Sequence, residues 1–243
     1  MKPIRLVCAT RADPDTFIDT TALGRSLKMF NPQPEPQLQL FGNNTLGLPQ
    51  VYNIALKHAE QDPAILVFVH DDVYLTDFFW MDRLYEGLQQ FDVRGLAGNT
   101  RRVPRQPAWA FTTATPNLQW DERRYLSGSV GHGQGFPCKN IAIFGPAKQA
   151  CKLLDGLFLA ADSEVLNRAG VRFDERFAFH FYDMDFCRQA ELKGLRMGTW
   201  PIAVVHESGG NFGSQGWKDG YAKYLQKYPD DEREGAAARR AGA

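Results

Sequence analysis

The sequence lacks several features that would assign it to a specialised class of protein. No apolar run approaches the ~20 residues that a membrane-spanning helix requires, so we expect no transmembrane segment. The chain passes from Met1 almost directly into an apolar run, so we expect no secretory signal. The cysteines form no CxxC motif, which is typical of free thiols in a reducing compartment; they are Cys8, Cys138, Cys151 and Cys187. These absences predict a cytoplasmic protein, with peripheral association at the inner face of the membrane left open.

The sequence also lacks an excess of charge of either sign. Lys and Arg together number 28, as do Asp and Glu, so the net charge gives no indication of a nucleic-acid partner. No internal repeat is present, which excludes a solenoid or propeller. What remains is a chain of 243 residues with 44% hydrophobic content, which suits one large α/β domain or two small ones.

Apolar runs of strand length alternate with segments of helical periodicity. This alternation predicts an α/β fold with parallel strands and right-handed crossovers. We therefore expect a Rossmann-like, mostly parallel central sheet flanked by helices. The predicted strands cover residues 4–8, 38–41, 65–69, 93–97, 141–144, 157–160 and 202–205. The predicted helices cover residues 14–29, 49–59, 77–90, 162–168, 183–193 and 217–228, and a turn is predicted at 31–36.

Residues 99–136 interrupt the alternation and hold little periodicity. They include several prolines and the glycine-rich segment 128–135. A loop of this length in a compact domain is usually functional or mobile. We expect a long substrate-facing insertion at about 99–136, with residues 128–135 acting as a lid. The sequence thus predicts one domain over residues 1–228 and a flexible tail over 229–243.

The apolar run at 65–69 ends in His70-Asp71-Asp72. Five β-branched or large apolar residues are typical of a strand buried on both faces of a parallel sheet. Ligands of open α/β sheets bind beyond the carboxyl ends of the strands. Two carboxylates and an imidazole at that position favour Mg²⁺ or Mn²⁺. The alternative is a polar loop that begins with solvated aspartates.

Two later positions offer chemistry of the same kind. His206 follows the predicted strand 202–205, and neutral imidazole is a common ligand of Mn²⁺. Asp183 begins a predicted helix, where it would face the cleft near the positive end of the helix dipole. Asp185 points about 200° away and is expected to form a structural ion pair. The alternatives are that His206 is an ordinary satisfied polar residue and that Asp183 is a helix cap.

Together these segments resemble the family-2-type glycosyltransferases of the GT-A fold, which are inverting enzymes that use nucleotide-sugar donors. The DxD motif of that family corresponds to His70-Asp71-Asp72, and its ED motif corresponds to Tyr182-Asp183. The resemblance covers residues 4 to about 210 and is closest to a bacterial glycosyltransferase-like branch, whose relatives often act in polysaccharide biosynthesis. The further matches, in chain order, are Asn53, Asp155-Gly156 with the apolar residues after it, 170–175, Asp185 to Arg188, Gly194, Pro201 and His206.

The resemblance implies a metal-dependent, inverting glycosyltransferase with Asp183 as the general base. It implies Mn²⁺ or Mg²⁺ as cofactor and a nucleotide-sugar donor, with a UDP-sugar favoured. The acceptor would be a glycan or a lipid-linked glycan. The expected metal ligands are Asp72, His206 and His70. The expected donor-binding residues are Thr10, Arg11, Asn53, Asp71 and Gly156, and the weaker acceptor candidates are Trp109, Trp120 and Tyr182.

Two departures from the family pattern keep other interpretations open. His70 replaces the first aspartate of DxD, and Tyr182 replaces the glutamate of ED. The main alternative is therefore a catalytically inactive GT-A-like domain that binds a sugar or nucleotide. A metal-dependent phosphodiesterase would need a second carboxylate cluster, which the sequence does not offer. Basic residues at 101, 102 and 105 would either meet a phosphate or acidic acceptor or belong to a solvated loop.

Overall fold

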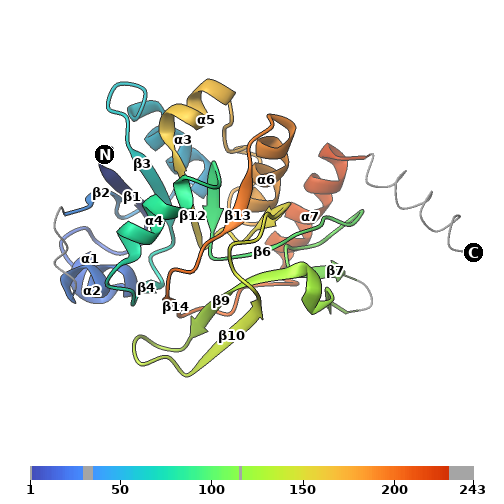
Figure 1. The fold of residues 1–243 in the computed structure, drawn as a ribbon, viewed down its shortest axis with the longest axis horizontal. Helices are drawn as coiled ribbons and strands as arrows, with labels where there is room; N and C mark the ends of the chain where they lie inside the picture. The colour runs from blue at the N-terminus through green and yellow to red at the C-terminus, as the bar shows by residue number, and fades with distance from the viewer. Residues whose placement is uncertain (1, 30–34, 115–116, 230–243) are drawn as a thin grey trace, which may run out of the picture.

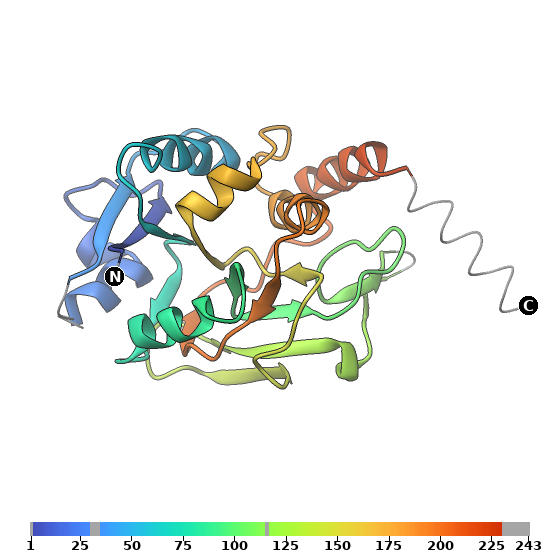
Figure 2. The same ribbon diagram turned by 45° about the horizontal axis from the view of Figure 1, so that its top comes forward.

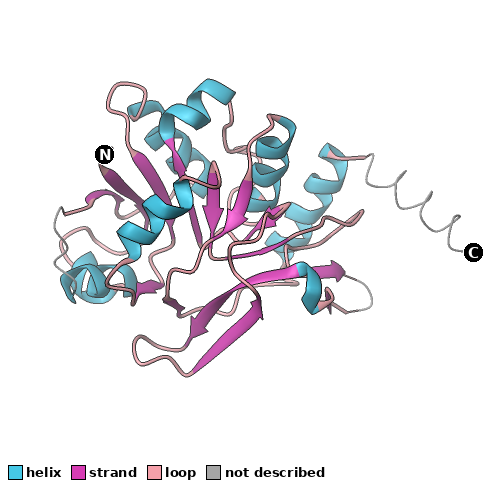
Figure 3. Ribbon diagram, in the orientation of Figure 1, coloured by secondary structure: helices cyan, strands magenta, loops and turns pink. Residues whose placement is uncertain are grey.

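The computed structural model describes residues 2–29, 35–114 and 117–229, and it contains two main sheets with helices packed around them (Figures 1 and 3). Most of the turn predicted at 31–36 and nearly all of the tail predicted at 229–243 lie outside these residues. Within the described part, no helix is both long and apolar enough to cross a bilayer.

The first sheet has six strands and confirms the predicted mostly parallel arrangement. Five of its strands run in the same direction, and only β12 is antiparallel to its neighbours. The spatial order is β13 (Met197–Thr199), β5 (Val93–Gly95), β12 (Phe158–Asp162), β3 (Ile65–Val69), β1 (Ile4–Ala9) and β2 (Gln37–Phe41).

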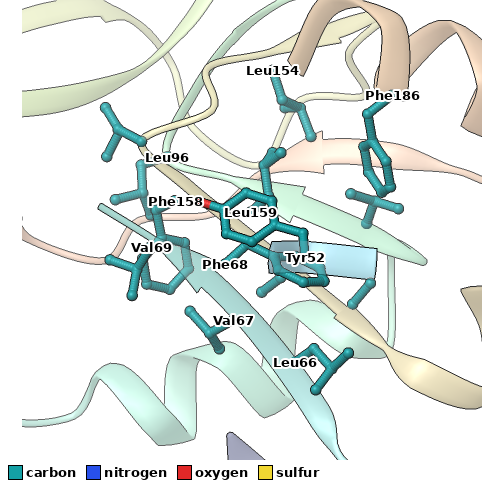
Figure 4. Packing of buried hydrophobic residues seen from close by; sticks show 14 of the residues in the cluster. Tyr52, Leu66, Val67, Phe68, Val69, Leu96, Leu154, Phe158, Leu159 and Phe186 are labelled. Atoms are coloured by element: carbon teal, nitrogen blue, oxygen red, sulfur yellow. The ribbon is translucent and has the colours of Figure 1, made fainter. Parts of the chain in front are cut away.

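Helices cover both faces of this sheet. Figure 2 shows α3 (Leu48–His58), α5 (Ser163–Ala169) and α6 (Tyr182–Leu192) on one side and α4 (Trp80–Leu88) on the other. Every residue of β3 is therefore buried, as its continuous apolar run predicted. Tyr52 of α3 packs on Phe68 of β3 with ring centroids 4.7 Å apart, in the cluster drawn in Figure 4. Each large apolar side chain buried here contributes about 1.5–3 kcal/mol.

The second sheet takes strand β9 from the segment expected to be an insertion. Its order is β11 (Leu153–Leu154), β6 (Ala97–Asn99), β9 (Leu126–His132), β14 (Val204–His206) and β4 (Val73–Leu75), and β10 (Asn140–Gly145) also pairs with β9. A two-stranded ribbon of β7 (Phe111–Thr113) and β8 (Gln119–Trp120) and a 3₁₀ turn, η1 (Arg123–Tyr125), precede β9.

The glycine-rich segment is therefore largely a strand, and the prediction of a lid at 128–135 was wrong. Gly128 shows why. Its backbone has φ +92°, and a Cβ built there would lie 1.9 Å from the carbonyl oxygen of Leu96. Glycine in a strand often marks such a close backbone approach. Here it permits β9 to pair with β6 and β10 at once.

Two predicted elements are each divided in the structure. The helix predicted at 14–29 is broken at Thr21, whose backbone is extended, into α1 (Phe17–Thr20) and α2 (Ala22–Met29). The strand predicted at 93–97 becomes β5 and β6, which belong to different sheets. Helix α7 (Gln215–Lys227) follows the second sheet and packs its buried Trp217 and Tyr224 against Phe181.

Candidate active site

A cavity of about 590 Å³ lies where the two sheets meet. Residues from the end of β3, the turn before β12, the start of α6 and the end of β14 line it. It brings together most of the predicted site residues: His70, Asp71, Asp72, Trp109, Trp120, Gly156, Tyr182, Asp183 and His206. Thr10, Arg11 and Asn53 are not among its lining residues.

The strand pairing explains why Asp72 and His206 meet. The His70-Asp71-Asp72 motif carries the chain from β3 in the first sheet to β4 in the second. Strand β14 pairs antiparallel with β4, and its His206 lies opposite Val73. The backbone N–H of Glu207 then donates to the carbonyl of Asp72 at 3.0 Å. Adjacent strand ends thus deliver both side chains to one point.

His70, Asp72 and His206 form a compact cluster of candidate metal ligands. One ligand atom from each lies within 4.8 Å of the others. Nε2 of His206 is 3.3 Å from Oδ1 of Asp72, and Nδ1 of His70 is 4.0 Å from the same oxygen. This Asp72 oxygen is buried and, among the described residues, accepts no hydrogen bond of good geometry. An unsatisfied buried carboxylate oxygen facing two imidazoles fits a divalent cation.

The hydrogen-bond network fixes which nitrogen of His70 faces this cluster. The hydroxyl of Tyr182 donates to the carbonyl of Gly156 at 2.9 Å and therefore accepts from Nε2–H of His70 at 2.7 Å. Nδ1 of His70 then carries the lone pair that faces Asp72. Tyr182, which lines the cavity and is expected to contact an acceptor, also orients a candidate metal ligand.

The electrostatics of the cluster keep Asp72 ionised. Burial alone would raise the pKa of Asp72, but the adjacent His206 imidazole outweighs this and the pKa is lowered to about 2. Burial lowers the pKa of His70, so its imidazole is neutral and can act as a ligand. Burial opposes protonation of His206 too, but the adjacent Asp72 carboxylate outweighs this and raises the pKa of His206.

Asp183 lies in the first turn of α6, which begins in an unusual way. Phe181, just before the helix, has φ +67°, a left-handed conformation that is uncommon for a bulky residue. Its buried ring packs between Trp217 and Tyr224 of α7, which holds this conformation in place. Strained backbone of this kind often occurs at functional sites.

The Asp183 carboxylate is half-buried and has a raised pKa. Its Oδ2 accepts the Gly156 N–H at 3.2 Å, and its Oδ1 accepts the Met184 N–H at 2.8 Å. Burial first, and then the negative charge of Asp155, raise its pKa to about 7, although the backbone hydrogen bonds oppose the shift. A carboxylate with a pKa near neutrality is suited to accept and release a proton.

Asp155 and His132 are lining residues to which the sequence analysis gave no role. Asp155 accepts the indole N–H of Trp109 at 2.9 Å and the backbone N–H of Leu157 at 3.1 Å. Asp155 precedes Gly156 in one of the segments that match the glycosyltransferase pattern, and this position could have identified it as a candidate site residue. The ring of His132, at the end of β9, lies 6.4 Å from that of His206. The strand-end argument would have found His132 had β9 been predicted as a strand.

Three of the expected donor-binding residues lie outside the cavity lining. Thr10 is buried and donates to Oδ2 of Asp71 at 2.6 Å, so it positions a lining residue. Asn53 bonds both the carbonyl and the N–H of Phe173, at 2.8 and 3.0 Å. These two hydrogen bonds give Asn53 a structural role, because they tie α3 to the backbone of Phe173. Arg11 is exposed.

The basic residues of the 99–136 segment do not enter the cavity. Arg101 forms an ion pair with the buried Asp121, and Arg102 forms one with Glu191. Among the described lining residues there is no Lys or Arg at all. Structural pairing, rather than contact with a phosphate or an acidic acceptor, accounts for Arg101 and Arg102.

No protein-family model matches the chain, and no curated protein matches it in sequence. Its fold is similar to that of GalNAc-T7 with UDP, GalNAc and Mn²⁺, with a TM-score of 0.55 and 12% identity over 93% of this chain and 48% of that one. It is also similar to the catalytic domain of Drosophila β1,4-galactosyltransferase 7 in complex with xylobiose, with a TM-score of 0.51 and 9% identity over 91% and 80%.

A structure of S. aureus TarS residues 1–349 matches with a TM-score of 0.47 and 14% identity, over 84% of this chain and 60% of that one. The chain thus spans less than two thirds of the TarS and GalNAc-T7 structures. The similarity to GalNAc-T7 and to the galactosyltransferase nevertheless extends over nearly all of this chain. The chain has the GT-A fold of glycosyltransferases.

Proposed function

We propose that this protein transfers a sugar from a nucleoside-diphosphate donor to an acceptor hydroxyl, with inversion at the anomeric carbon. The observation that carries the proposal is the convergence, in one cavity, of the His70–Asp72–His206 cluster and the Asp183 carboxylate. A metal-dependent, inverting transferase needs both, because one stabilises the departing diphosphate and the other activates the acceptor. Residues 1–228 would form the catalytic domain.

The donor end of the cavity would be the His70–Asp72–His206 cluster. His70, Asp72 and His206 would hold a divalent cation, which would supply positive charge to stabilise the departing diphosphate, so no protein acid would be required. Since the described lining contains no Lys or Arg, such a cation would be the main positive charge beside the diphosphate. Two imidazoles and one carboxylate suit Mn²⁺ better than Mg²⁺, which prefers oxygen ligands.

Asp183 would act as the general base. Its carboxylate would take the proton of the acceptor hydroxyl as the oxygen attacks the anomeric carbon from the face opposite the diphosphate. A base in this position contributes about 10²–10⁴-fold in rate. The raised pKa of about 7 matches this task near neutral pH, where the group is partly ionised and can still hold a proton.

The GalNAc-T7 structure contains UDP and Mn²⁺, which supports testing a UDP-sugar and Mn²⁺ first. The experiment is a thermal-shift screen of UDP-, GDP- and dTDP-sugars with Mn²⁺ and Mg²⁺, followed by an assay of donor hydrolysis and transfer. Stabilisation should increase with the logarithm of donor concentration over its dissociation constant. Binding without hydrolysis or transfer would favour the inactive sugar-binding alternative, and no binding of any donor would reject both.

We expect the protein to act in the cytoplasm or at the inner face of the membrane, on a glycan or lipid-linked acceptor. The resemblance to a bacterial branch carries this expectation. Expression in a bacterial host with separation of soluble and membrane fractions would test the location.

A further inference from the structure

The cavity has two chemically different ends. The polar end carries the carboxylates of Asp71, Asp72, Asp155 and Asp183 together with the imidazoles described above. The other end is aromatic. It is lined by Trp120 of β8, Phe111 of β7, Phe144 of β10 and Phe212 from the loop after β14.

The aromatic side chains form one continuous surface. The rings of Trp120 and Phe144 are stacked, with centroids 6.0 Å apart and an interplanar angle of 24°. Phe111 lies 4.7 Å from Trp120 and 5.2 Å from Phe212, so it connects the two sides of the surface. These residues come from three separate segments, yet all of them turn toward the same cavity.

Exposure separates the two tryptophans that the sequence pointed to. Trp120 is 55% exposed and Phe212 is 41% exposed, whereas Trp109 is only 8% exposed. The indole N–H of Trp109 also donates to Asp155, and its ring packs edge-on against Phe144. Trp120 therefore offers an open ring face to a ligand, and Trp109 supports the wall behind it.

The charge of the cavity restricts what this surface can accept. An anionic group beside it would find no Lys or Arg among the described lining residues, and the polar end of the same cavity adds four aspartates. The basic residues that follow Trp120 most closely in the sequence are not lining residues: Arg123 donates to the carbonyl of Ile143, and Arg124 forms an ion pair with Glu122. Such a group would lose hydration without gaining a counter-ion, which is strongly unfavourable.

We propose that the acceptor is an uncharged carbohydrate whose apolar ring face lies on Trp120, and that the aromatic end of the cavity excludes acceptors bearing a carboxylate or phosphate. The role of acceptor rests on the proposed function. Binding of the carbohydrate at this site does not, and it can be measured without transfer. The C–H groups on one face of a pyranose pack well on an aromatic plane, while its hydroxyl edge remains free to reach the carboxylates.

Saturation-transfer NMR without donor tests the site directly. The probes are matched pairs that differ by one charge, phenyl β-D-glucopyranoside with phenyl β-D-glucuronide and phenyl β-D-galactopyranoside with its galacturonide. At least one neutral member should bind, and its charged partner should bind at least about 100-fold more weakly, as expected for an unpaired charge that loses its hydration. Trp120→Ala should weaken neutral binding by about tenfold or more, from the loss of one stacking partner.

Two control variants separate stacking from general damage. Trp120→Phe retains an aromatic plane and should recover much of the binding. Phe136→Ala removes another aromatic residue, 63% exposed and outside the cavity lining, and should leave binding unchanged. Equal binding of charged and neutral partners, no neutral binding, or no effect of Trp120→Ala would each overturn the inference. Selective neutral binding without any sugar transfer would instead reject the transferase and keep the site.

Discussion

Replacement of Asp183 by Asn should strongly reduce transfer. It should also change the stability of the protein in a pH-dependent way: the stability of the variant relative to the parent should increase as the pH rises from acid to neutral. The two effects share one cause. The folded state holds the Asp183 carboxylate at a pKa of about 7, against an ordinary value of 3.8. Ionisation of Asp183 therefore costs more free energy in the folded protein than in the unfolded chain, and this difference lowers the free energy of unfolding. The penalty begins as the pH rises above 3.8 and is complete above about 7.

The size of the penalty follows from the shift. About three pKa units at 1.36 kcal/mol each give an upper bound of about 4 kcal/mol. The side chain is half-buried and opens on a cavity that admits solvent, so screening reduces this to about 1–2 kcal/mol. Asn cannot accept both the Gly156 and the Met184 N–H, which costs about 1 kcal/mol at every pH.

Melting temperatures measured at two pH values isolate the pH-dependent part of the stability change. The melting temperature of Asp183→Asn minus that of the parent should increase by about 2–4 °C between pH 5 and pH 8. Turnover should fall by at least about 100-fold, while donor binding by calorimetry is retained. Glu86→Gln, an exposed carboxylate change on α4, is the matched control and should show no such trend. A melting-temperature difference that is flat with pH would refute the raised pKa, and near-parental turnover would remove Asp183 from the role of base.

The remaining predictions concern the ligand cluster and the turn beside it. Asp72→Ala should abolish metal-dependent donor binding in calorimetry; binding that is equal with and without EDTA would contradict this assignment. Asp155→Asn removes a charge that raises the pKa of Asp183, so the acid limb of the kcat profile should move to lower pH; an unmoved limb would exclude that coupling. Gly156→Ala should reduce turnover by at least about tenfold, because its Cβ would lie 2.3 Å from the Tyr182 hydroxyl and displace the neighbouring base. Gly216→Ala, where a Cβ meets only ordinary contacts, is its control and should stay active.

The sequence predicted five of the six strands of the first sheet and missed β13, which has only three residues. Residues 65–69 form a strand buried along its whole length, and the polar residues after it line the cavity. Asp185 is also as predicted. It is fully buried, and Lys227 pairs with its Oδ1 at 2.5 Å while the Tyr228 hydroxyl donates to the same oxygen at 2.7 Å. Helix periodicity alone was enough to separate it from Asp183.

The second sheet was not predictable in the same way. Strand β9 contains Gly128 and Gly131, which carry no apolar signal and usually count against a strand. They are needed because neighbouring backbones approach closely. A Cβ at Gly131 would lie 2.9 Å from the carbonyl oxygen of Val204. Glycines required by tertiary contacts of this kind produce no alternation of apolar and polar residues in the sequence. His132 was therefore missed together with its strand.

The position of the cavity at the junction of two sheets explains both what was found and what was missed. His70 follows a strand of the first sheet and bonds to Tyr182, which is tied to the turn before β12 through Gly156. His206 comes from the second sheet and reaches Asp72 only because β14 pairs with β4. Each residue type could be inferred locally from a strand end. Their separation of a few ångströms depends on how the sheets pack, so a change that shifts the second sheet should disturb the ligand cluster before it disturbs Asp183, whose partners Gly156 and Met184 lie outside that sheet.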